Sequence, residues 1–236
     1  MEKTKTLDDL HKERADDFLP LNGTDYIELY VGNAKQSAYF YQYAFGFDLV
    51  AYAGPETGLR EKASYVLQQN KVRLVLTTSL NPASEISEHV KRHGDGVKVL
   101  ALWVDDAEKS YQETLKRGAV SAAPPAVLKD AFGEVKTASI CTYGETVHTF
   151  VERKNYTGPF LPGYVQAKSP FKTTSTGLKY VDHCVGNVAL GEMNQWVKFY
   201  EDVMGFKLLI TFDDNDISTE YTALMSKVVS NKNEYI

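Results

Sequence analysis

The chain has 236 residues, of which 43% are hydrophobic and 24% are charged, and its formal net charge is −5. This composition is typical of a soluble globular protein with a sizeable core, and the negative charge disfavours nucleic acid or an anionic membrane as a partner. The apolar runs are too short to span a bilayer, and the charged segment 1–18 lacks the apolar core of a signal peptide. Cys141 and Cys184 suggest no disulfide framework, so we expect a cytoplasmic protein.

The first predicted unit combines one helix with four strands. Residues 25–33 alternate, with Ile27, Leu29 and Val31 on one face, which predicts a half-buried strand. An aromatic-rich helix follows, and Gly46 is placed to end it. Three further strand-like runs complete a βαβββ order, at residues 47–53, 63–69 and 72–78.

The same order follows a second time. After a helical stretch at residues 82–94, residues 97–104 predict a strand. Residues 105–118 predict an amphipathic helix, with Asp105 as its N-cap and Gly118 at its end. Three extended pieces then lead to residue 153. The sequence therefore predicts two consecutive βαβββ modules.

A break in the pattern comes next. Residues 155–177 contain three prolines and three glycines without periodicity, which is typical of a linker. Beyond it the pattern restarts, with a strand at 179–187, a helix at 191–205 and strands at 206–212 and 218–226.

The restart is an internal repeat. The matching pairs are Val31-Gly32-Asn33 with Val185-Gly186-Asn187, Phe40-Tyr41 with Phe199-Tyr200, and Gly46-Phe47 with Gly205-Phe206.

In this register His183 lies opposite Leu29, and Val99 takes the comparable place in the middle module. The two-residue period groups His183 with Val181 and Val185, on the face that a curled sheet would enclose. His183 is then either an interior histidine with satisfied hydrogen bonds or one ligand of a metal site. The residues alone favour the interior histidine.

Six motifs, spread in order from about residue 25 to the C-terminus, carry a specific resemblance. They are "YVGNAKQSAYFY", "GPETGLRE", "LNPASEISEHVKRHGDGVK", "TYGETVHTFVERKNYTGPFLPGY", "VDHCVGNV" and "STEYTALMSKVVSN". Together they make the chain similar to the 4-hydroxyphenylpyruvate dioxygenase family of the vicinal-oxygen-chelate superfamily.

This resemblance implies an α+β fold in which βαβββ modules pair into open barrels, with one complete domain and the first part of a second. The implied divisions are an N-terminal extension at 1–21, a metal-free domain of two modules at 22–154, a linker at 155–178 and the truncated start of the catalytic domain at 179–236.

The resemblance also implies an Fe(II) site, one per complete catalytic domain, made by two histidines and one glutamate. His183 matches the first ligand, and Val185 and Ser226 match positions that line the substrate pocket. Such a ligand set leaves one side of the iron open for a 2-oxo acid and O₂. The implied reaction converts 4-hydroxyphenylpyruvate and O₂ to homogentisate and CO₂ in tyrosine and phenylalanine catabolism, in a homo-oligomer that needs no nucleic acid or membrane.

The sequence contains no histidine after His183. In the family, the second histidine and the glutamate lie further along the chain, so we expect the 236 residues to be a fragment that is inactive alone. Two other functions stay open. One is 4-hydroxymandelate synthase, a relative that uses the same substrate and iron. The other is a metal-free binding protein built from the same modules.

Five other candidate residues are not expected to bind a metal. His89 and His93 lie four residues apart on a predicted helix, a spacing that allows two imidazoles to share a metal. No third ligand accompanies them in the sequence, so an exposed helix end is expected instead. His148 and Glu152 lie on one predicted strand and are expected to be structural. Cys184 should point away from the face that carries His183, and we do not expect it to be a ligand.

Overall fold

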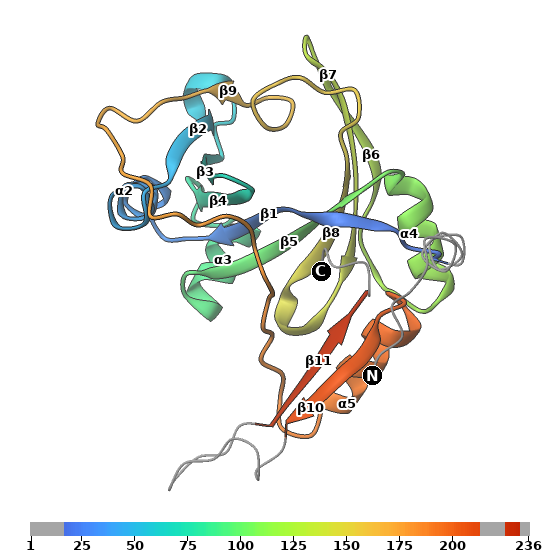
Figure 1. The fold of residues 1–236 in the computed structure, drawn as a ribbon. Coiled ribbons are helices and arrows are strands. Elements are labelled where there is room, and N and C mark those ends of the chain that lie inside the picture. The colour runs from blue at the N-terminus through green and yellow to red at the C-terminus, as the bar shows by residue number, and fades with distance from the viewer. Residues whose placement is uncertain (1–16, 213–224, 232–236) are drawn as a thin grey trace, which may run out of the picture.

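The computed structural model describes residues 17–212 and 225–231, and its first module has the predicted βαβββ order (Figure 1). Asn33 caps the helix through a hydrogen bond from the Gln36 backbone N–H, and Gly46 ends it with a left-handed φ of 70°. The elements are β1 (Leu21–Tyr30), α2 (Ala34–Phe45), β2 (Asp48–Ala53), the short helix η1 (Pro55–Thr57), β3 (Lys62–Gln69) and β4 (Val72–Ser79).

The second module repeats that order after one additional helix. Its helix α4 is capped by Asp106, whose Oδ1 accepts a hydrogen bond from the Lys109 backbone N–H at 2.9 Å. The expected cap, Asp105, was wrong by one residue, because adjacent aspartates offer the same side chain to the helix start. The elements are α3 (Glu85–His93), β5 (Gly96–Val104), α4 (Ala107–Lys116), β6 (Ser121–Asp130), β7 (Gly133–Cys141), η2 (Tyr143–Glu145) and β8 (Val147–Glu152).

The strands of both modules, with the short strand β9 (Val165–Gln166), form one curled sheet in the order β6-β7-β8-β5-β1-β4-β3-β2-β9 (Figure 1). The central strands β1 and β5 are antiparallel. Each is parallel to the last strand of its own module, β4 and β8 respectively. The two halves therefore repeat one topology, and the predicted vicinal-oxygen-chelate fold is confirmed.

The helices α2 and α4 cover the outer face of this sheet. Ala34 and Ala38 of α2 pack into one buried cluster, and α4 packs into another. Because side chains alternate along a strand, β1 directs Leu29 toward α2 and Tyr26 to the opposite, inner face. The buried cluster on the inner face consists of Tyr26, Ala51, Val66, Val75, Val99, Ala101, Val135, Val151 and Phe160.

The segment 155–178 packs against the sheet rather than running free of it. β9 pairs with β2, and Phe160 is only 2% exposed in the inner-face cluster. This segment, gold to orange in Figure 1, passes α2 before reaching the third module. The module begins with α5 (Met193–Asp202) and a separate two-stranded sheet of β10 (Lys207–Phe212) and β11 (Ser226–Ser230). The predicted strand at 218–226 falls mostly outside the described residues.

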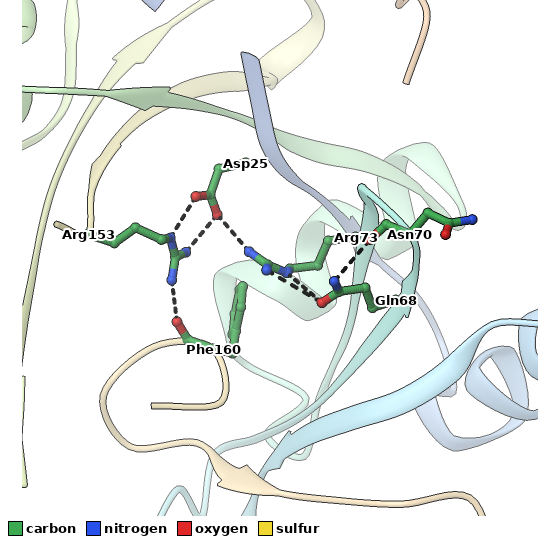
Figure 2. Close-up of polar contacts among 6 residues, drawn as sticks. All are labelled: Asp25, Gln68, Asn70, Arg73, Arg153 and Phe160. Atoms are coloured by element: carbon green, nitrogen blue, oxygen red, sulfur yellow. Dashed lines mark hydrogen bonds and ion pairs between the residues drawn. The ribbon is translucent and has the colours of Figure 1, made fainter. Parts of the chain in front are cut away.

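A buried carboxylate fastens Phe160 to the inner face (Figure 2). Asp25 accepts two hydrogen bonds from Arg153, both 2.6 Å long, and pairs with Arg73 at 3.3 Å. The remaining guanidinium nitrogen of Arg153 donates to the Phe160 carbonyl at 2.5 Å. Both guanidinium groups lie within 6 Å of the Phe160 ring centroid, at 5.7 and 5.8 Å. The network joins β1, β4, the end of β8 and the segment after it.

Candidate metal centre

His183 lies in an exposed segment, residues 181–189, that has no regular secondary structure. The side chain is 73% exposed, and its Nδ1 lies 2.7 Å from the Asp182 carboxylate. The expectation of a strand at 179–187 with His183 on an enclosed face is therefore wrong for this structure. The ring geometry still suits a metal ligand, because a carboxylate on Nδ1 orients the imidazole and leaves Nε2 for the ion.

Comparing the first and third modules explains why residues 181–189 do not form a strand. β1 is held between β4 and β5 by hydrogen bonds on both edges. The antiparallel pair β10–β11 corresponds to β2–β3 of the first module. Within the described ranges, the third module has no counterpart of β4 or β5. Segment 181–189 therefore lacks both flanking strands that would hold it as a strand.

The chain just before His183 is bound to the first module instead. The Leu178 backbone N–H donates to Gln69 Oε1 at 2.8 Å, and the Lys71 N–H donates to the Lys179 carbonyl at 2.9 Å. Val181 packs against the cluster beneath α2. These contacts end at Val181, and the following side chains become exposed.

Of the two predicted pocket residues, Val185 lies in the same segment as His183 and Ser226 lies in a separate strand. Val185 is 79% exposed in the same irregular segment. Ser226 is half-buried at the start of β11, where it pairs with Phe212 of β10. No strand pairing among the described residues joins segment 181–189 to this hairpin, so the structure does not assemble the three residues into one site.

The structure also revises the register of the repeat around His183. Leu29 packs on the α2 side of β1, whereas Tyr26 faces the inner cluster. Aligning Asp25-Tyr26 with Asp182-His183 places Tyr26 opposite His183. In this register, the stretch from His183 to the start of α5 at residue 193 is only two residues longer than the stretch from Tyr26 to the start of α2 at residue 34. Tyr26 is therefore the better counterpart, and neither register puts a histidine in the first module.

Aromatic packing fills the inner face around Tyr26. The rings of Tyr26 and Phe160 meet edge to face with centroids 5.1 Å apart, and Tyr164 contacts Phe160 at 4.9 Å. Burial, and then the neighbouring Glu28, raise the pKa of Tyr26 well above its usual range, so the phenol stays protonated. A protonated phenol inside a packed aromatic cluster is poorly suited to bind a metal.

The described residues supply one ligand toward an iron site at His183. In the ranges 17–212 and 225–231, a single group of three side chains is arranged to hold a metal ion, and it consists of His89, His93 and Glu145. Asp182 orients His183, but no described pair of side chains completes its ligand set. An iron centre at His183 would need two ligands from outside these ranges.

The sequence pattern indicated His89 and His93 but did not identify Glu145 as the third member of this group. Glu145 belongs to η2, between β7 and β8, and no sequence pattern links it to α3. The hydrogen bond from His93 and the charge of Arg92 lower the pKa of Glu145. The expected exposed helix end is wrong for His89, which is 7% exposed because its ring packs edge to face on Tyr30 at 5.4 Å.

His148 and Glu152 have the structural roles expected of them. His148 is buried on β8, and its Nε2 lies 2.9 Å from the Tyr200 hydroxyl of α5. Burial lowers the pKa of His148 to about 4, so the ring is neutral at pH 7. Glu152 pairs with Lys136 at 3.0 Å and accepts a hydrogen bond from the Ala107 backbone N–H at the start of α4.

Comparison with known proteins supports the fold and identifies related proteins. Residues 23–131 match the family model of the Glyoxalase/Bleomycin resistance protein/Dioxygenase superfamily. The chain is 42% identical over 223 residues to 4-hydroxyphenylpyruvate dioxygenase of Yarrowia lipolytica, an alignment that covers 91% of this chain and 57% of the relative. The protein of that name from Danio rerio is 43% identical over 217 residues, or 89% of this chain and 55% of the relative.

Solved structures give the same architecture. A triple mutant of 4-hydroxymandelate synthase from Streptomyces coelicolor has a TM-score of 0.76 at 26% identity, covering 92% of this chain and 61% of that one. A fusion of a xylose isomerase-like TIM barrel with 4-hydroxyphenylpyruvate dioxygenase has a TM-score of 0.66 at 16% identity, covering 92% and 32%, which supports the fold alone.

The chain spans 55–61% of the length of the curated relatives compared with it. Over that length, the chain is a homologue of the 4-hydroxyphenylpyruvate dioxygenases and has the vicinal-oxygen-chelate fold of the glyoxalase and dioxygenase superfamily.

Proposed function

We propose that these residues belong to an Fe(II)-dependent dioxygenase that converts 4-hydroxyphenylpyruvate and O₂ to homogentisate and CO₂ in tyrosine and phenylalanine catabolism. The observation that carries the proposal is the 36–43% identity to curated 4-hydroxyphenylpyruvate dioxygenases, in alignments that cover 89–96% of the chain. The 236 residues alone should be inactive, because the described part offers the iron one ligand.

In this proposal His183 is the first iron ligand, through Nε2, and Asp182 holds its ring by accepting a hydrogen bond from Nδ1–H. Iron bound by two histidines and a carboxylate supplies open positions at which a 2-oxo acid and O₂ can bind together. The side chain of Val185 forms part of the apolar wall around the substrate ring, and the Ser226 hydroxyl provides a polar contact in that wall.

We also propose domain boundaries and a cellular location for the chain. Residues 1–21 are an extension, 22–154 the metal-free domain, 155–178 the linker and 179–236 the start of the catalytic domain. Both cysteines are free, which supports a cytoplasmic location. No helix within residues 17–212 or 225–231 has the length and apolar character needed to cross a membrane. The substrates are small molecules, and the complete protein forms a homo-oligomer.

Product analysis tests this function. The complete gene product containing these residues is incubated with Fe(II), ascorbate, O₂ and 4-hydroxyphenylpyruvate, and the products are separated by chromatography. Homogentisate and CO₂ in equal amounts are expected, with no turnover by the 236-residue chain alone. Absence of any O₂-dependent product would contradict the proposal and favour a metal-free binding protein.

4-Hydroxymandelate synthase is the second candidate, favoured by the TM-score of 0.76 to that enzyme. The same incubation separates the two enzymes, because the synthase would give 4-hydroxymandelate in place of homogentisate. Identity is higher to the curated dioxygenases, at 36–43%, than to the synthase structure, at 26%. The dioxygenase is therefore preferred.

A further inference from the structure

The meeting point of α3 and η2 brings together three metal-binding side chains, and His183 is not one of them. His89 and His93 lie one turn apart at the end of α3, with ring centroids 4.6 Å apart. Glu145 reaches them from η2. His89 and His93 ring nitrogens and a Glu145 carboxylate oxygen all lie within 4.8 Å of one another.

The separations of these atoms approach those around a bound transition metal. Glu145 Oε2 lies 3.1 Å from His93 Nε2 and 3.8 Å from His89 Nδ1. Bonds of about 2.0–2.1 Å in a tetrahedral zinc site put neighbouring ligand atoms about 3.4 Å apart. The two observed distances fall on either side of that value. The His93 and Glu145 side chains are 34% and 47% exposed, which leaves room for a water molecule as the fourth ligand.

Surrounding contacts hold the three side chains in place. Tyr30 packs against the His89 ring, and Arg92 binds the other carboxylate oxygen of Glu145, Oε1. Lys98 Nζ donates to the Glu145 backbone carbonyl at 2.5 Å. Glu145 also has a φ of 63°, a backbone conformation that is uncommon for residues other than glycine. The carboxylate is therefore positioned with Oε2 toward the two imidazoles.

We propose that His89, His93 and Glu145 form a second metal site, which binds one divalent transition-metal ion of the Zn²⁺ or Co²⁺ class. Two imidazole nitrogens and one carboxylate suit these ions better than Mg²⁺ or Ca²⁺, which prefer ligand sets made of oxygen. The ion would join the end of α3 to the turn between β7 and β8. The site serves the stability of the first two modules and is independent of the proposed iron centre.

Cobalt titration of the 236-residue chain tests the site, because tetrahedral Co²⁺ gives visible absorption bands. Wild type should bind one equivalent. His93→Gln and Glu145→Gln should each weaken binding at least tenfold. Two variants serve as controls: His183→Gln removes another exposed imidazole, and Glu113→Gln removes an exposed carboxylate elsewhere. Both should bind Co²⁺ like wild type.

Thermal unfolding supplies a second readout that does not depend on the cobalt spectrum. Zn²⁺ at a concentration that saturates wild type should raise the Tm of wild type and of His183→Gln, and should raise the Tm of His93→Gln and Glu145→Gln less, because weaker binding stabilises the folded state less. Circular dichroism without metal checks that each variant is folded. Absence of a cobalt complex in folded wild type, or a complex lost in His183→Gln and kept in His93→Gln, would overturn the proposal. Neither result bears on homogentisate formation by the complete gene product.

Discussion

Strand β1 and segment 181–189 begin two copies of one sequence pattern, yet they have different structures. β1 pairs on one edge with β4 and on the other with β5. Segment 181–189 has no strand partner among the described residues, and His183 within it is exposed. The difference shows that alternating apolar and polar residues mark a segment that can form a strand. Whether the strand forms depends on neighbouring strands that can hydrogen-bond to it.

The two copies also differ in what occupies the inner face. In the first copy, Tyr26 and Phe160 fill it with aromatic packing, and Asp25 fixes Phe160 in place through Arg153. In the second copy, the corresponding Asp182-His183 pair is exposed to solvent. A filled face stabilises the protein, whereas an open face with a histidine can accept a metal and a substrate. The first copy therefore has the packing of a structural unit, and the proposed iron ligand lies in the second copy.

Removing Phe160 tests the filled face and has the largest expected effect. Phe160→Ala leaves a cavity beside Tyr26, and truncation of a buried phenylalanine costs about 3–5 kcal/mol. Urea denaturation of the two proteins measures the difference in the free energy of unfolding. Phe132→Ala is the matched control, because Phe132 is 53% exposed and should cost less than about 0.5 kcal/mol. Equal effects of the two variants would show that the inner face is not filled by Phe160.

The buried His148, on β8 of the second module, should make the first two modules sensitive to acid. Its pKa is about 4 in the folded protein, against about 6.5 in an unfolded chain, so the unfolded state takes up the proton first as the pH falls. Stability from the neutral ring is fully present above pH 6.5. As the pH falls toward 4, the free energy of unfolding loses this contribution, which amounts to about 3 kcal/mol in total.

Unfolding free energies of wild type and His148→Gln between pH 7 and pH 4 check this effect. Carboxylates contribute equally to both proteins and cancel in the difference. Wild type should lose stability more steeply than the variant, by up to about 1.4 kcal/mol per pH unit. Parallel curves would rule out a buried neutral histidine at this position.

The two helix-ending glycines give a smaller contrast between the copies. Gly46 and Gly205 both have left-handed backbones, with φ of 70° and 72°. A side chain at Gly46 would lie 2.0 Å from the Thr174 carbonyl oxygen, whereas one at Gly205 would meet the Phe18 ring at 2.8 Å. Gly46→Ala should cost about 2–3 kcal/mol and Gly205→Ala about 1–2 kcal/mol, because a backbone yields less than a side chain.

Thermal unfolding of the two glycine variants measures this difference. If Gly205→Ala proves as costly as Gly46→Ala, then segment 155–178 does not pack on α2 as the structure shows.

Much of the fold could be predicted from the alternation of apolar residues and from the glycines that end helices. Both modules were found in order, and the repeated glycine at 46 and 205 has the same backbone in each copy. The docking of segment 155–178 could not be predicted, because a two-residue strand and one inserted aromatic ring leave no periodicity.

The candidate sites were harder to predict than the fold. The Val-Gly-Asn match suggested Leu29 as the counterpart of His183, but β1 has irregular pairing with β5 between Glu28 and Leu29 and before Tyr26, and such irregularities shift a simple repeat. The third ligand near α3 was missed because Glu145 lies 52 residues from His93, and only the folded chain brings them together. The role proposed for His183 rests on the family resemblance, because the sequence pattern alone favoured an interior histidine.

Iron content is the most direct test of the role assigned to His183. The complete gene product is loaded with Fe(II) under anaerobic conditions, desalted and measured for iron, as wild type, His183→Ala and His93→Gln. The account predicts that His183→Ala loses one equivalent of iron and all homogentisate formation, while His93→Gln forms homogentisate like wild type. A His183→Ala protein that keeps its iron and its activity would contradict the assignment of His183 as an iron ligand.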